Sequence, residues 1–127
     1  MSRVDLHLHS QASDGTLTPA EVVRAVAKQG LTGLSLTDHD TVVGLEEAGA
    51  EASRLGLDFL VGAELSANEP GRSVHVLAYG FDPAHPELLE FFENFRIDRI
   101  RRAEKMVDSL NEHGVDLHMD AVMREAV

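Results

Sequence analysis

The sequence of 127 residues contains no cysteine, so it can form neither a disulfide nor a thiolate metal site. Basic residues are also scarce, because 11 lysines and arginines stand against 22 acidic residues and the net charge is −11. Such a charge argues against extended nucleic-acid binding by phosphate neutralisation. It still allows a small anionic substrate, since bound divalent cations reverse the local potential.

Long apolar runs are missing as well. No stretch approaches the roughly 20 apolar residues that cross a bilayer, and the first residues, MSRVDLHL, lack a signal-peptide pattern. We therefore expect no membrane contact and a cytoplasmic location. Hydrophobic residues make up 43% and charged residues 26% of the sequence, and this balance is typical of a folded globular protein.

Hydrophobic periodicity predicts an alternation of strands and helices. The first helix has the clearest start, with Thr18 as N-cap, Pro19 in the first turn and Glu21 completing a capping box. Strands are expected over 4–10, 32–40, 57–66 and 73–81, with a turn at 67–72, and helices over 19–29, 43–56, 86–113 and from 120 onward. This order indicates an α/β fold with a largely parallel sheet.

Histidine, aspartate and glutamate gather where these strands end. His7 and His9 are two residues apart on a predicted strand and therefore point to the same face. The full set of candidate ligands is His7, His9, Asp14, His39, Glu64 and His75. Each has an ordinary structural explanation by itself, such as a turn residue for Asp14. Their joint occurrence on four successive elements predicts a metal site, because reactive groups collect at the carboxyl ends of parallel strands.

The donor types restrict the metal. Imidazole and carboxylate ligands without sulfur suit zinc, manganese or iron better than calcium or magnesium. Six ligands exceed the three that a catalytic zinc ion uses, so at least two ions are expected, with Glu64 able to bridge them. Two ions about 4 Å apart activate a water molecule and bind both oxygens of an in-line displacement. This chemistry predicts phosphoester hydrolysis.

Four stretches of the sequence resemble successive motifs of a known family, the PHP (polymerase and histidinol phosphatase) family. They are DLHLHSQASDGTLTPAEVV, GLSLTDHDTVVGLEEA, GAELSA and VHVLAYGFD. The likeness is strongest to stand-alone members that act on nucleotide or short oligonucleotide phosphates, and it runs from about Val4 to Asp82. The later stretch FRIDRIRRAEKMVDSLNEHGV is similar to a helical segment inserted after the fourth strand in those proteins.

The resemblance implies a fold and a ligand set. The fold is the N-terminal half of a distorted (βα)7 TIM-like barrel over 1–82, followed by the start of a helical insertion over 83–127. His7 and His9 would hold one metal together with Glu64, which bridges to a second metal on His75. Asp14 and His39 would hold a third. Hydroxide on the metals would be the nucleophile.

Three further residues have two interpretations each. Asp40 either orients His39 or takes part in proton transfer. Arg99 and Arg102, at i and i+3 in the predicted long helix, either lie on a solvated face or bind a substrate phosphate.

The sequence departs from the family pattern after His75. The family's late Asp-x-His motif has no counterpart in a matching context, because Asp116 and His118 follow the long helix in a predicted loop. The chain therefore looks like the first half of such a protein. Its function is predicted to be metal-dependent hydrolysis of small phosphate esters. The alternative is a catalytically impaired metal-binding fragment, or a half-domain that forms homo-oligomers through open sheet edges.

Overall fold

The computed structural model describes residues 3–69 and 72–125. The described chain divides into two compact units, one ending at His85 and the other beginning at Pro86. The first unit contains all the strands and two helices, and the second contains two helices. None of the helices in these described ranges is long and apolar enough to span a bilayer.

A parallel sheet forms the centre of the first unit. Its strands β1 (Val4–Leu8), β2 (Gly33–Leu36) and β3 (Asp58–Phe59) pair in that order. All four residues of β2 are buried, as expected for the middle strand of a covered sheet. The predicted parallel arrangement is thus confirmed for these three strands.

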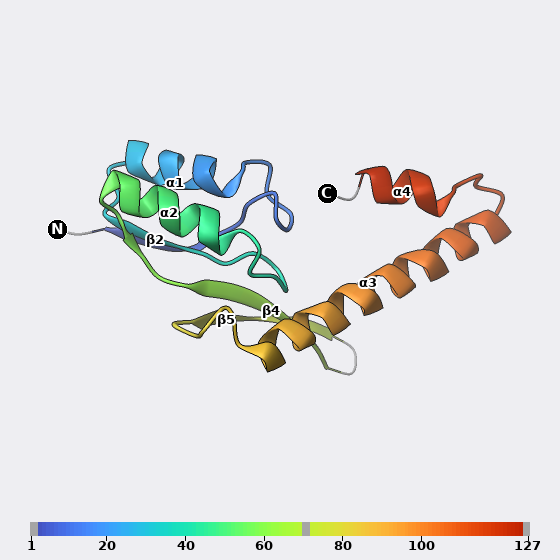
Figure 1. Cartoon of the computed structure of the whole chain (residues 1–127). Helices are drawn as coiled ribbons and strands as arrows, with labels where there is room; N and C mark the ends of the chain where they lie inside the picture. The colour runs from blue at the N-terminus through green and yellow to red at the C-terminus, as the bar shows by residue number, and fades with distance from the viewer. Residues whose placement is uncertain (1–2, 70–71, 126–127) are drawn as a thin grey trace. The chain divides into compact units, whose positions relative to one another are not determined.

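Helices α1 (Pro19–Lys28) and α2 (Leu45–Leu55) cover one face of this sheet (Figure 1). The predicted capping box is present, since Thr18 accepts from the Glu21 amide and the Glu21 carboxylate accepts from the Thr18 amide. The core between helices and sheet consists of Val22, Val23, Val26, Leu34, Leu36, Leu45, Ala48 and Ala52. This packing fixes the strand ends from which the candidate ligands project.

The strand predicted over 57–66 is in fact two strands, and this part of the prediction was wrong. Its first part, β3, pairs with β2 and ends at Phe59. Its second part, β4 (Gly62–Glu69), pairs antiparallel with β5 (Arg72–Tyr79) in a separate two-stranded ribbon. The first unit therefore contains a three-stranded parallel sheet and a separate antiparallel ribbon, rather than one largely parallel sheet. The turn predicted at 67–72 includes residues 70–71, which lie outside the described residues.

Gly62 explains how the ribbon approaches β2. A Cβ atom at this position would overlap the Ser35 Oγ and would lie 2.9 Å from the Thr37 Cγ2, which is closer than non-bonded atoms allow. Beyond Gly62, an isolated parallel bridge joins His39 to Glu64. The absence of a side chain at Gly62 thus lets β4 run directly beside the segment that follows β2.

The second unit consists of α3 (Pro86–Glu112) and α4 (Met119–Glu125). The long helix ends one residue before the predicted end, and Gly114 follows with a φ of 85°, a left-handed conformation that glycine adopts without strain. The Asn111 side chain then hydrogen-bonds both the amide and the carbonyl of Leu117. These contacts close the loop between the two helices.

Candidate metal centre

Four strands and the loops that follow them supply the candidate ligands. His7 lies in β1 and His9 one residue beyond it, whereas His39 follows β2. Glu64 is the third residue of β4, not the end of a strand as predicted, and His75 lies within β5. Asp14 lies in the loop between β1 and α1.

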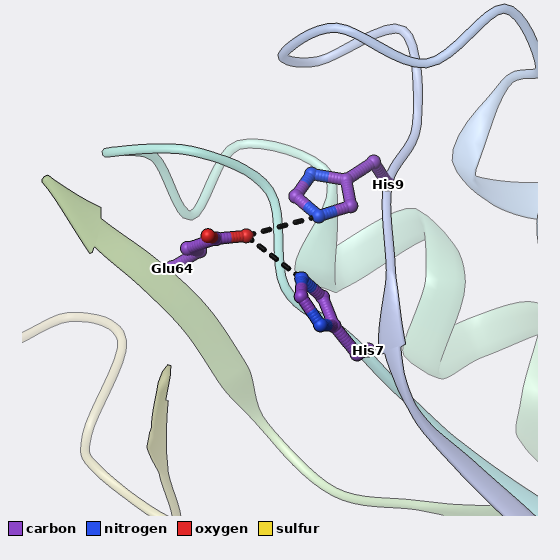
Figure 2. Close-up of side chains that lie close together, drawn as sticks. All are labelled: His7, His9 and Glu64. Atoms are coloured by element: carbon purple, nitrogen blue, oxygen red, sulfur yellow. Dashed lines mark hydrogen bonds and ion pairs between the residues drawn. The ribbon is translucent and has the colours of Figure 1, made fainter. Parts of the chain in front are cut away.

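Glu64 stands at the centre of this arrangement. Its Oε2 lies 2.8 Å from the His7 Nε2 and 3.1 Å from the His9 Nε2, so both imidazoles converge on one carboxylate oxygen (Figure 2). Its Oε1 lies 2.9 Å from the His75 Nδ1. The His39 Nε2 is 3.8 Å from Oε2. Four imidazoles thus surround one carboxylate.

Asp14 joins the cluster on the other side of His9. Its Oδ1 lies 3.2 Å from the His9 Nδ1, and its Oδ2 lies 3.6 Å from the His39 Nε2. The Asp14 side chain is 65% exposed, in contrast to 7% for Glu64. The cluster therefore has a buried carboxylate at its base and an exposed one at its rim.

Burial and hydrogen bonding act in opposite directions on Glu64. Burial raises its pKa, but the hydrogen bond from His7 and the charges of His39, His7 and His9 outweigh this effect and lower the pKa below its usual value. Glu64 is consequently an anion at neutral pH. A buried anion ringed by imidazole nitrogens is a suitable environment for a divalent cation.

The polar atoms around the cluster fit a metal better than they fit one another. The His9 Nδ1 is buried and makes no well-oriented hydrogen bond in the described part of the chain, although the Asp14 Oδ1 lies only 3.2 Å away; proteins normally avoid such an arrangement. Three sets of ligand atoms lie within 4.8 Å of one another: His7, His9 and Glu64; His9, Asp14 and His39; and His39, Glu64 and His75. The nitrogen and oxygen donors suit first-row divalent metals.

Asp40 occupies a different position from the imidazoles. Its Oδ1 accepts a hydrogen bond of 2.7 Å from the Ser66 amide, and its own amide donates to the Glu64 carbonyl. Asp40 is buried and has a φ of 51°, a conformation uncommon outside glycine, asparagine and aspartate. Its contacts thus join the segment after β2 to β4, and its role in orienting His39 or in proton transfer remains a prediction.

Asp38 is the residue that sequence reasoning missed. It is 3% exposed, and its carboxylate accepts hydrogen bonds from Ser10 and Ser13. The sequence places these serines more than twenty residues away, so no local pattern reveals the contact. Its position directly before His39 was the only available signal.

The two arginines proposed to bind phosphate lie in α3, in the second unit. Arg99 and Arg102 are exposed. Neighbouring Arg96 and Arg101 form ion pairs with Glu93 and Asp98, each three residues earlier. Substrate contact by Arg99 and Arg102 stays a prediction.

The remaining histidines lie outside the three ligand sets found among the described residues. They are His85, His113 and His118. His113 contacts the Ser109 carbonyl through its Nδ1 at 2.7 Å, and His118 lies 3.6 Å from Asp116 on an exposed loop. These three residues provide natural controls for experiments on the cluster.

Known proteins similar to this chain include a phosphatase and an exoribonuclease. A 3',5'-nucleoside bisphosphate phosphatase from Chromobacterium violaceum is 43% identical over 98% of the chain and 44% of its own length. A 5'-3' exoribonuclease from Haemophilus influenzae is 38% identical over 89% of the chain and 41% of its own length. The chain therefore spans less than half the length of these relatives.

A solved structure leads to the same group of proteins. It comes from a Bifidobacterium adolescentis protein described as a metal-dependent phosphoesterase, is 36% identical, and superposes with a TM-score of 0.87 over 98% of this chain and 43% of that one. The sequence profile of the PHP domain matches residues 5–123. On this match, which covers most of the sequence and all six candidate ligands, the chain belongs to the PHP domain family.

Proposed function

We propose that this chain carries the metal site of a phosphoesterase that hydrolyses small phosphate monoesters or diesters, such as nucleotide or short oligonucleotide phosphates. The observation that carries the proposal is the position of Glu64, a buried carboxylate contacted by His7, His9 and His75 and flanked by His39. The phosphatase and exoribonuclease similarities support this substrate class.

Two or three divalent ions would occupy the cluster, and zinc, manganese and iron match its donors. His7, His9 and Glu64 would hold the first; Glu64 would be shared with a second on His75; Asp14 and His39 would hold the third. When bound, such ions lower the pKa of water and polarise phosphoryl oxygens.

The side chains of the cluster would hold the ions and balance their charge. The Glu64 carboxylate would neutralise cation charge from its buried position, and the histidines would donate neutral nitrogens. The net charge of −11 disfavours the binding of an anionic phosphate. Bound cations would counter this effect, because they reverse the local potential.

The experiment compares metal content and hydrolysis in three proteins. Wild type, His7→Ala and His118→Ala are loaded with Mn²⁺, dialysed and measured by elemental analysis, and each is then assayed with p-nitrophenyl phosphate and a nucleoside 3',5'-bisphosphate. We expect wild type and His118→Ala to retain metal and release phosphate. His7→Ala should lose metal and activity together, because its Nε2 is one of the two nitrogens nearest to the Glu64 Oε2.

Three other results would contradict the proposal or part of it. Retention of metal without hydrolysis of either substrate would favour a metal-binding module over an enzyme. Equal metal content in wild type and His7→Ala would contradict the ligand assignment. A wild-type chain that holds no metal after loading would contradict the metal site altogether.

A further inference from the structure

Asp38 is a buried carboxylate that the proposed metal site does not use. It lies directly before His39 and is 3% exposed. Its Oδ1 accepts hydrogen bonds of 2.7 Å from the Ser10 amide and from the Ser13 hydroxyl. Its Oδ2 accepts one of 2.7 Å from the Ser10 hydroxyl. A carboxylate with three short hydrogen bonds is a strong anchor, because its charge strengthens each of them.

These contacts reach the loop of residues 10–15, which carries Asp14. The loop is also closed internally, since the amides of Ser13 and Gly15 donate to the Ser10 carbonyl at 3.1 and 2.8 Å. A Cβ atom on Gly15 would lie 2.6 Å from the His9 carbonyl oxygen, so the loop requires glycine there. The loop is thus folded tightly against the end of β1, with Asp38 as its external support.

The surroundings of Asp38 fix its own position. A Cβ atom on Gly44 would lie 3.1 Å from the Asp38 Oδ2, so the chain packs closely behind the carboxylate. The Asp38 carbonyl also accepts a hydrogen bond of 3.2 Å from the Glu64 amide. One residue therefore contacts the loop through its side chain and β4 through its backbone.

We propose that Asp38 is a positioning residue that holds loop 10–15 so that Asp14 faces His9 and His39. The inference rests on the proposed metal site, because its purpose is to orient a ligand. Asp14 is exposed and lies 3.2 and 3.6 Å from those two imidazoles. Ordering its loop before a cation arrives removes an entropic cost that binding would otherwise bear.

Ser13 connects the two carboxylates and gives the sharpest test. Its hydroxyl lies 2.7 Å from the Asp38 Oδ1 and 3.3 Å from the Asp14 Oδ1. Ser13→Ala breaks this connection and leaves both Ser10 contacts in place. Asp38→Ala removes all three, whereas Asp38→Asn keeps the shape and lets the Ser10 hydroxyl accept instead of donate. The matched control is Ser35→Ala, a buried hydroxyl without a hydrogen-bond partner among the described residues.

Mn²⁺ binding to the whole chain is measured by equilibrium dialysis for these variants and for Asp14→Ala. We expect Ser13→Ala and Asp38→Ala to weaken, by about 10–100-fold, the same binding step that Asp14→Ala removes. Asp38→Asn should recover most of the affinity, and Ser35→Ala should match wild type. Affinities for Ser13→Ala and Asp38→Ala equal to that of Ser35→Ala would overturn the inference.

A second readout needs no metal. Amide hydrogen exchange at Ser13 and Gly15 reports the closure of the loop, and it should be faster in metal-free Ser13→Ala and Asp38→Ala than in Ser35→Ala. Unchanged exchange would overturn the inference even if Asp38→Ala fails to fold, since Ser13→Ala retains both Ser10 contacts. Faster exchange in a chain whose wild type binds no Mn²⁺ would support the positioning role and contradict the proposed metal site.

Discussion

The two units of the chain use glutamate in opposite ways. In the first unit, Glu64 has a side chain that is 7% exposed and contacts histidines from other parts of the sequence. In the second, Glu93 is 53% exposed and pairs with Arg96, three residues later on the same helix. One carboxylate depends on the tertiary fold, and the other on a single helical turn.

This difference shows which charged residues are candidates for chemistry. An exposed pair at i and i+3 contributes little to stability and is screened by salt. A buried carboxylate is costly unless hydrogen bonds or cations compensate it. The contacts around Glu64 are therefore expected to matter mainly for cation binding. The ion pair of Glu93 is expected to contribute only a little to the stability of its helix.

The largest effect should come from removing the charge of each glutamate in turn. Glu64→Gln is expected to abolish tight Mn²⁺ binding, because Glu64 belongs to two of the three ligand sets and a neutral amide binds cations weakly. Glu93→Gln, the same change on the helix surface, should leave binding intact. Equilibrium dialysis with elemental analysis measures both. Equal loss in the two variants would mean that overall charge, rather than the cluster, attracts the metal.

A smaller effect is expected from adding one methyl group to a glycine in each unit. Gly62→Ala should lower the free energy of unfolding by about 1–3 kcal/mol, because the new Cβ meets the Ser35 Oγ. Gly114→Ala should cost about 1 kcal/mol from its left-handed backbone alone, since nothing lies within 4 Å of its Cβ position.

Urea unfolding followed by circular dichroism measures the two costs, and Mn²⁺ dialysis adds a second comparison. Gly62→Ala should also weaken metal binding, because it displaces β4 and Glu64 from β2. Gly114→Ala should not. Weaker binding in Gly114→Ala than in Gly62→Ala would contradict the role given to the approach of β4 to β2.

The smallest effect concerns pH and is confined to α3. The hydrogen bond from Arg96 lowers the pKa of Glu93 below its ordinary value of 4.5, against a weaker opposing effect of burial. A lowered pKa means that the pairing stabilises the helix above 4.5 and is lost as the pH falls through the folded-state pKa. Circular dichroism should show a slightly smaller loss of helicity on acidification in Glu93→Gln than in wild type. An identical acid response would show that the pair contributes nothing measurable.

Local signals in the sequence were sufficient for the helices. Thr18, Pro19 and Glu21 specify the start of α1 within four residues, and Gly114 follows the end of α3 within two. Each of these signals acts through the backbone of its own turn. No distant contact is needed to interpret them.

The division of the third predicted strand required tertiary information. The run from Leu57 to Ser66 has no polar interruption that marks a boundary between Phe59 and Gly62. The separation arises because Gly62 fits against Ser35, a contact that the order of residues does not reveal.

The candidate ligands were predictable as a set, and their support was not. His7 and His9 carry a spacing that implies a shared face, and both do contact Glu64. The hydrogen bonds from Ser10 and Ser13 to Asp38 join positions 28 and 25 residues apart. Ordinary residue types at such separations give no pattern, so sequence reasoning had no means to find them.

The contact between His7 and Glu64 joins positions 57 residues apart, and the hydrogen bond from the Tyr79 hydroxyl to the Leu6 carbonyl joins positions 73 apart. Closing loops of this length is slow, because the chain loses entropy before any contact rewards it. The cluster is consequently complete only after the parallel sheet and the ribbon have both formed and come together. An ion held there would act in this cysteine-free chain as a reversible cross-link, and its uptake would mark the last step of folding.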